Sequence, residues 1–167
     1  IRGPTRVPSA SPLQLSERYL LQKRIAISHG CALFRRDFLL HRPYPENLRG
    51  GEDIPVFVHM LISGPVVTTD AALARIHKHR DSLRHDRGDE EARAQLLVEE
   101  VFAGLPPECQ PLRRRYAAQR YLSLFRTAVQ SGDRLAAKRY FGAAWRLHRL
   151  QVLRWSYLRK AARLFFQ

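Results

Sequence analysis

The sequence predicts an α/β portion followed by an all-α tail, with helix predominating over the chain as a whole. In the first hundred or so residues, short apolar and β-branched runs typical of buried strands alternate with a segment of helical period. After residue 111 every apolar pattern has the helical period. The net charge of +14 is equally uneven: residues 1–109 hold 15 Lys/Arg and 14 Asp/Glu, whereas residues 110–167 hold 14 Lys/Arg and one acid. We therefore expect two functional parts, the second of which faces polyanions.

A short proline-rich stretch divides the chain. Three prolines within residues 105–111 predict a linker between a first part, residues 1–104, and a tail, residues 112–167. The chain begins with Ile1 and a Pro/Ser-rich stretch, so we interpret it as a piece of a longer protein. No stretch approaches ~20 apolar residues, which argues against a membrane-spanning helix. The two cysteines do not make a disulfide framework, and reduced cytosolic thiols are expected.

Residues 25–34, rich in Ile, Ala and Leu, predict a buried strand with a close backbone approach at Gly30. His29 and Cys31 lie within this run. A nucleophilic Cys/His pair would need a third, orienting residue, which the pattern does not supply, so Cys31 is expected in the core. A Pro/Gly/Asn loop follows over residues 41–51.

The most informative stretch is residues 50–53, in which two glycines precede two carboxylates at the point where a helix begins. Residues 54–64 have the apolar spacing of one buried helical face. Pro55 fits only in the first helical turn, which makes Glu52 or Asp53 the N-cap. The ordinary interpretation is that Asp53 caps the helix and Glu52 is solvated. The functional interpretation is an acidic site held at a helix N-terminus.

Two further strands are expected after that helix, at residues 66–69 and 72–79. His77 and His79 would share one face of the second strand. With His85 they form H-x-H-x5-H, and two of these side chains could be zinc ligands. Histidines flanked by Lys and Arg are more often ordinary loop residues.

The remaining patterns are helical and cover residues 11–22, 90–103, 112–130, 134–148 and 150–165. Between two of them, Ser131-Gly132-Asp133 predicts a turn in which Gly132 ends one helix and Asp133 caps the next. We expect a helical hairpin similar to a single tetratricopeptide unit, with no second copy.

Basic and aromatic side chains alternate near the end of the tail. The basic candidates for contact with an anionic membrane are Arg146, Arg149, Arg154, Arg159, Lys160 and Arg163. The same residues could bind nucleic-acid phosphates or form the solvated face of a helical bundle. Because Trp and Phe residues lie close to the basic edge and no nucleic-acid motif is present, a membrane is favoured over RNA or DNA.

Three segments occur in a recognisable order: SHGCALFRRDFL, then PENLRGGEDIPVFVHMLISG, then VVTTDAALARIHKHRDSLRH. Together they resemble the C-terminal half of a family 2 glycosyltransferase catalytic domain, which has a GT-A-type, Rossmann-like fold. The family pattern is a strand ending in small residues and Arg, a loop leading to Glu-Asp at a helix, a Gly closing it, and a strand followed by His and Ser. The resemblance covers about 60 residues, and the basic helical tail is also similar to what bacterial members carry.

The resemblance implies an inverting transfer of a sugar from a nucleotide-sugar donor to a glycan or lipid-linked acceptor. Asp53 would be the general base that deprotonates the acceptor hydroxyl, with Glu52 beside it; an attacking hydroxyl needs such a positioned carboxylate. Gly30 and Cys31 would line the floor under a bound sugar, and Gly51 would belong to the substrate-binding loop.

The resemblance also implies a divalent metal, Mg or Mn, at the donor diphosphate. His79 or His77 would lie beside the metal-bound diphosphate, with Ser82 nearby. The family holds this metal with a D-x-D motif, and no D-x-D occurs in this sequence. We therefore expect activity from a parent enzyme and not from this piece alone, and we assign no cofactor to the piece itself.

The leading hypothesis is thus the acceptor-side portion of a bacterial enzyme that builds a surface polysaccharide or lipopolysaccharide. It would be cytoplasmic, with the basic tail peripheral on the inner face of the cytoplasmic membrane. The alternative is a non-enzymatic basic helical module that binds nucleic acid, an anionic membrane or a protein partner. A third possibility is that the tail mediates self-association. The pattern does not define an oligomeric state.

Overall fold

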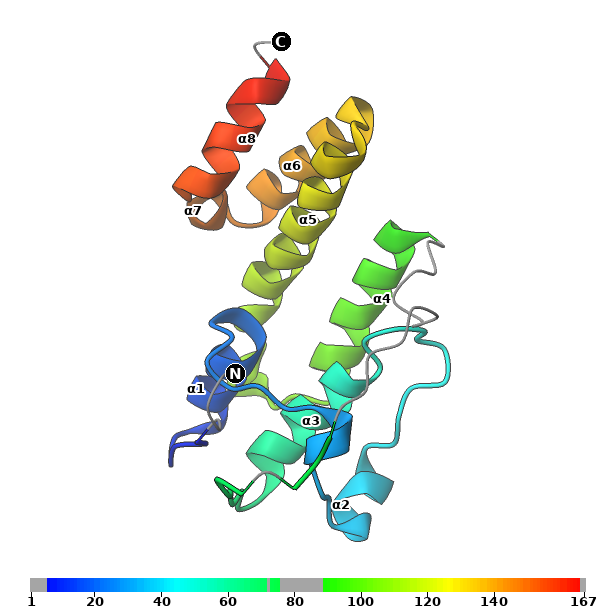
Figure 1. Ribbon diagram of the computed structural model, residues 1–167, viewed down its shortest axis with the longest axis vertical. Coiled ribbons are helices and arrows are strands. Elements are labelled where there is room, and N and C mark those ends of the chain that lie inside the picture. The colour runs from blue at the N-terminus through cyan, green and yellow to red at the C-terminus, as the bar shows by residue number, and fades with distance from the viewer. Residues whose placement is uncertain (1–5, 72, 76–88, 166–167) are drawn as a thin grey trace. The chain divides into compact units, whose positions relative to one another are not determined.

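The structure is a computed structural model that describes residues 6–71, 73–75 and 89–165 (Figure 1). Its helices are α1 (Pro12–Ser16), α2 (Arg36–His41), α3 (Asp53–Ser63), α4 (Glu90–Ala103), α5 (Leu112–Ser131), α6 (Arg134–Leu147), α7 (Arg149–Val152) and α8 (Trp155–Phe165). Single π or 3-10 turns lie at Glu17–Leu21, His29–Cys31 and Pro107–Cys109. The described residues form two compact units. The first unit contains residues up to 75 and residues 99–110, and the second contains residues 89–98 and 111–165, so that α4 contributes to both.

The predicted α/β fold class is wrong for these described ranges, because they contain helices and turns and no strand. A strand is stable only when its backbone N–H and C=O groups pair with a neighbouring strand. In the predicted strand at residues 25–34, Ser28 and Ala32 do have extended backbones. They flank the 3-10 turn His29–Cys31, however, which is closed by a 3.0 Å hydrogen bond from the Cys31 N–H to the Ser28 carbonyl. The local preference for extended backbone is therefore present, but the partner that would make it a strand is not found among the described residues.

The strand predicted at residues 66–69 does not form, and neither does the described part of the strand predicted at residues 72–79; the apolar side chains there are not covered. Val67 in residues 66–69 is 94% exposed, and Leu73 is 81% exposed. Residues 73–75 have no regular structure, and the rest of the predicted strand at 72–79 lies outside the described residues. The close backbone approach predicted at Gly30 is also wrong, since a Cβ atom built there would meet nothing within 4 Å.

In the first unit, α3 has the predicted position and buried face. The helix begins at Asp53, with Glu52 at the N-cap and Pro55 in the first turn, where a missing N–H breaks no intrahelical hydrogen bond. Phe57 and Val58 are fully buried, as the apolar spacing predicts. The helix is therefore anchored by its core face, and its N-terminus is held in one place.

The second unit is built on the α5–α6 hairpin, and the predicted turn is confirmed. Gly132 has φ +77°, a left-handed conformation that favours glycine. The Asp133 side chain accepts a hydrogen bond from the Ala136 N–H at 2.9 Å and so caps α6. The hairpin core includes Leu122, Phe125, Ala128, Ala137, Ala144, Val152 and Ala161.

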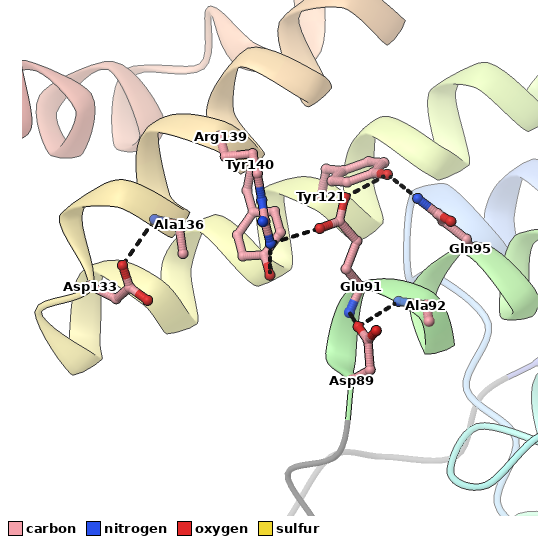
Figure 2. Close-up of polar contacts among 9 residues, drawn as sticks. All are labelled: Asp89, Glu91, Ala92, Gln95, Tyr121, Asp133, Ala136, Arg139 and Tyr140. Atoms are coloured by element: carbon pink, nitrogen blue, oxygen red, sulfur yellow. Dashed lines mark hydrogen bonds and ion pairs between the residues drawn. The ribbon is translucent and has the colours of Figure 1, made fainter.

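A polar network fastens the first turns of α4 to this hairpin (Figure 2). Asp89 caps α4 by accepting hydrogen bonds from the backbone N–H groups of the following residues. The Glu91 carboxylate accepts a hydrogen bond from the Tyr121 hydroxyl at 3.3 Å and pairs with Arg139 at 2.8 Å. The amide of Gln95 donates to the Tyr121 oxygen at 2.8 Å. One half-buried carboxylate thus links three helices of the second unit.

The single helix predicted over residues 150–165 is wrong, because the chain breaks into α7 and α8 at Leu153 and Arg154. The physical reason is the core. Val152 and Ala161 are both buried in the hairpin cluster. Nine residues of continuous helix turn through about two and a half turns, which would place these two side chains on opposite faces. The break allows both to face the same core.

Candidate functional site

The acidic pair lies on a loop whose backbone requires glycine. Gly50 and Gly51 have φ values of +84° and +88°. A Cβ atom at Gly50 would meet nothing within 4 Å, so the left-handed conformation and not a lack of space demands glycine there. The Glu52 side chain makes no capping hydrogen bond, although Glu52 is the N-cap residue of α3. The Glu52 carboxylate is therefore not used in capping the helix.

Beside the pair lies an aromatic cluster that joins two separate loops. The rings of His29 and Tyr44 are stacked with centroids 5.3 Å apart, and the Tyr44 hydroxyl lies 3.5 Å from Nδ1 of His29. The His29 ring also packs against Phe57 of α3 at 5.0 Å. Because Phe57 is fully buried, it gives the cluster a fixed base. Two loops are thereby held against the first two turns of α3.

The carboxylates act electrostatically on this cluster. Burial raises the pKa of Tyr44, and the negative charges of Asp53 and Glu52 raise it further. Tyr44 therefore lies within electrostatic reach of both acids. The Oε2 atom of Glu52 is buried and has no hydrogen-bond partner among the described residues. A buried acceptor without a partner is uncommon and is satisfied when a ligand supplies a donor.

This combination defines what the site can do chemically. Two adjacent carboxylates can accept hydrogen bonds from a hydroxyl, and one of them can take its proton. Small-molecule sites usually combine a few polar groups with aromatic and apolar side chains. The geometry suits an uncharged, hydroxyl-bearing ligand better than an anion, because the carboxylates would repel negative charge.

Of the predicted substrate-binding residues, Gly30 and Cys31 follow His29 in the same turn, and Gly51 immediately precedes the acidic pair. Cys31 is exposed, so the prediction that it belongs to the core is wrong. The Cys31 side chain is not buried because the expected strand is a turn at this point.

The remaining predicted residues of this part, His77, His79 and Ser82, lie outside the described residues. Within the described ranges, no group of three or more His, Cys, Asp or Glu side chains is placed to hold a metal ion. The metal site therefore stays a prediction.

His29 and Tyr44 are the site residues that sequence reasoning missed. The sequence suggests His29 only as a base for Cys31, and Tyr44 lies in a loop of Pro, Asn and Arg that has no periodic pattern. The one available signal is an aromatic residue between two prolines, in a loop whose only other large apolar residue is Leu48. Stacking between residues 29 and 44 depends on the path of the chain, which residue spacing does not show.

The predicted basic residues lie in the second unit. Arg146, Arg149, Arg154 and Arg159 are exposed and Lys160 is half-buried, while Arg163 lies in α8. The Arg149 guanidinium lies 6.0 Å from the centre of the Trp145 ring, a cation–π geometry. None of the helices within the described ranges has the length and apolar character needed to cross a membrane.

Comparisons with protein-family models, curated proteins and solved structures found no match to this chain.

Proposed function

We propose that the first unit carries the acceptor-hydroxyl site of an inverting glycosyltransferase, with Asp53 as its general base. The observation that carries this proposal is the pair of carboxylates at the start of α3, one with a buried oxygen that lacks a hydrogen-bond partner among the described residues, beside Tyr44 and His29. The order of the three sequence segments supplies the reaction class. The acceptor class proposed with it is a glycan or lipid-linked saccharide.

The reaction at this site is a single displacement. The carboxylate of Asp53 takes the proton of the acceptor hydroxyl as the oxygen bonds to the anomeric carbon of the donor sugar. The bond from that carbon to the nucleoside diphosphate breaks, and the diphosphate leaves with the electron pair. The anomeric centre is inverted because attack and departure occur on opposite faces.

Glu52 and Tyr44 position the acceptor in this proposal. The buried Oε2 of Glu52 accepts a hydrogen bond from a hydroxyl of the acceptor sugar, which satisfies an oxygen that lacks a partner in the described residues. The Tyr44 phenol stays protonated well above neutral pH, because burial and the two acids raise its pKa, and so remains a hydrogen-bond donor. Holding the acceptor in a reactive geometry contributes to the rate in its own right.

The proposed chemistry involves the acceptor side of the reaction alone. A divalent metal at the donor diphosphate would neutralise the charge of the leaving group. The chain has no D-x-D, and the described residues contain no cluster that fits such an ion. We therefore assign no step at these residues to a metal.

The test uses the complete product of the gene that encodes this chain, with a panel of uridine- and guanosine-diphosphate sugars. Transfer is measured as labelled sugar incorporated into the lipid and glycan fractions of a membrane extract. Asp53→Asn is expected to lower kcat by about 100-fold or more, because the amide accepts no proton. The KM for the donor is expected to change little.

Asp70→Asn is the matched control: it makes the same chemical change at an exposed aspartate of the same unit, in a surface ion pair with Arg6. It should leave transfer unchanged. Retention of normal transfer by the Asp53→Asn protein would refute the assignment of the base. Absence of sugar transfer by the wild-type protein with every donor of the panel would refute the reaction class.

A further inference from the structure

The chain bends between α7 and α8 (Figure 1), and exposed apolar side chains lie at this bend. We define the α7–α8 tip as Leu150, Leu153 and Trp155, which are 74%, 47% and 77% exposed. Between them, Val152 is fully buried in the core of the unit. The inner side of the bend therefore holds the tip in place while its three apolar side chains face solvent.

The tip continues onto the exposed face of α8. Trp155 and Arg159 are four residues apart and lie on one face of the helix. Tyr157 and Ala161 lie on the other face and pack against the core. The apolar face of α8 is thus already used for folding, and the exposed tip is an addition to it.

Positive charge surrounds the tip, and no acid lies near it in the sequence. Arg149 and Arg154 flank it, Arg146 and Arg159 are exposed nearby in the sequence, and residues 134–167 contain nine Lys/Arg and no Asp or Glu. Single exposed apolar residues are ordinary on a protein surface. Three within six residues, bordered by arginine, match the composition of segments that insert shallowly into anionic lipid.

We propose that the α7–α8 tip docks on an anionic lipid bilayer. Leu150, Leu153 and Trp155 enter the boundary between headgroups and acyl chains, and Arg149 and Arg154 contact lipid phosphates. Charge complementarity selects this occupant over a neutral apolar partner, because docking of the tip brings two guanidinium groups to the same interface. Tryptophan suits this depth, since its ring is apolar and its N–H donates to the headgroups. This proposal is independent of the acceptor site in the first unit.

The test uses the whole chain with two kinds of large unilamellar vesicle. One contains phosphatidylcholine with about 30% of the anionic lipid phosphatidylglycerol, and the other contains phosphatidylcholine alone. Binding is measured by sedimentation. The chain has two tryptophans, so a Trp145→Phe background reports on Trp155 alone. We expect binding to the anionic vesicles that weakens with salt, a blue shift of Trp155 emission, and quenching by brominated lipid.

Two double variants separate the apolar and the charged contributions. Leu150→Ser with Leu153→Ser should weaken partitioning by about tenfold or more, because less apolar surface leaves water. Arg149→Gln with Arg154→Gln should weaken it about 30-fold, roughly fivefold for each charge lost at the surface. All four side chains are exposed, so the helical circular dichroism should be unchanged.

Control variants make the same kinds of substitution elsewhere in the second unit, one leucine and two arginines. Leu135→Ser alters a side chain that is 82% exposed at the start of α6, and Arg114→Gln with Arg126→Gln removes two exposed charges of α5. The Leu135 variant should bind as the parent does, and the α5 variant should lose less affinity than the tip variant. Equal effects of tip and control variants would overturn the proposal.

Polyuridylate, added as a competitor, distinguishes nucleic acid from lipid as the occupant of the tip. If the leucine double variant binds anionic vesicles as the parent does, while the arginine double variant loses both vesicles and polyuridylate, the surface is a nucleic-acid contact and the membrane proposal is rejected. If the leucine variant loses vesicle binding and keeps its weak, salt-sensitive affinity for polyuridylate, lipid is the occupant.

Discussion

The hydroxyl of Tyr44 lies 3.5 Å from Nδ1 of His29, and the two rings stack with centroids 5.3 Å apart. This contact joins the turn at His29–Cys31 to the loop that leads into the acidic pair. The His29 ring packs against Phe57 of α3, and the Tyr44 ring stacks on His29. The acidic pair therefore has a defined neighbourhood that is fixed by aromatic packing and not by the loop alone.

The ionisation of Tyr44 should report on the acidic pair. Burial raises its pKa most, and the charges of Asp53 and Glu52 add to the rise. Neutralising both acids by Asp53→Asn and Glu52→Gln should lower the Tyr44 pKa toward its ordinary value of about 10, without reaching it, because the burial remains. The measurement is a pH titration of the Tyr44 ring carbon by NMR. An unchanged titration in this variant would show that the acids do not face Tyr44, and Asp70→Asn serves as the control.

The same shift has a consequence for stability at high pH. A phenol whose pKa is higher in the folded than in the unfolded chain binds its proton more tightly when the chain is folded. Its contribution to the free energy of unfolding is therefore complete below about pH 10 and is lost as the pH rises through the pKa of the folded state. Tyr44→Phe should therefore make the free energy of unfolding fall less steeply above about pH 10. Urea unfolding followed by circular dichroism at a series of pH values measures this slope. An identical slope in the two proteins would contradict the prediction.

Glu100 should stabilise the first unit in a pH-dependent way. A hydrogen bond from Asn47 lowers its pKa most, and a hydrogen bond and charge from Arg42 lower it further, at distances of 3.0 and 3.1 Å. A carboxyl with a depressed folded pKa contributes stability above its unfolded value and loses it as the pH falls through the folded value. Glu100→Gln should cost about 1–2 kcal/mol at pH 7 and progressively less below pH ~4.5, measured by urea unfolding. The exposed Glu46→Gln is the control, and a cost independent of pH would refute the ionic origin.

The network around Glu91 should stabilise the second unit. The Glu91 carboxylate accepts a hydrogen bond from Tyr121 and forms an ion pair with Arg139 (Figure 2). Because the Arg139 side chain is largely exposed, the hydrogen bond should contribute more to stability than the ion pair. Glu91→Gln should lower the free energy of unfolding by about 1 kcal/mol more than Glu90→Gln. Glu90 lies one residue earlier in the same first turn of α4 and outside this network, so both changes remove the same favourable interaction with the helix dipole. Equal losses of unfolding free energy in the two variants would show that the network does not stabilise the unit.

Two glycines of the second unit should respond in opposite directions to the same substitution. Gly132→Ala places a Cβ at φ +77° and should cost about 1 kcal/mol through backbone strain, since nothing lies within 4 Å of the added atom. Gly142→Ala, inside α6 and also without a neighbour within 4 Å, should stabilise by about 0.5–1 kcal/mol. Thermal unfolding followed by circular dichroism measures both. Stabilisation by Gly132→Ala would show that the conformation of Gly132 in solution is not left-handed.

Helix positions and the carboxylates of the candidate site could be predicted from the sequence because both depend on neighbours along the chain. The helix at 90–103 is present with those bounds, and the Gly132–Asp133 turn forms as its residue types indicate. Glu52 and Asp53 could be placed at the start of α3 for the same reason, since Pro55 restricts where the helix can begin.

What only the tertiary structure decided involves residues that are distant in sequence. The apolar run at 25–34 contains extended residues, yet a strand needs a hydrogen-bonded partner, and the described chain places a turn there. The break between α7 and α8 follows from the need to bury both Val152 and Ala161 in one core. Tyr44 stacks on His29 because two loops converge, a contact of no fixed spacing. The sequence by itself thus determined the elements that close their own hydrogen bonds, and the fold decided every feature that needs a second segment of chain.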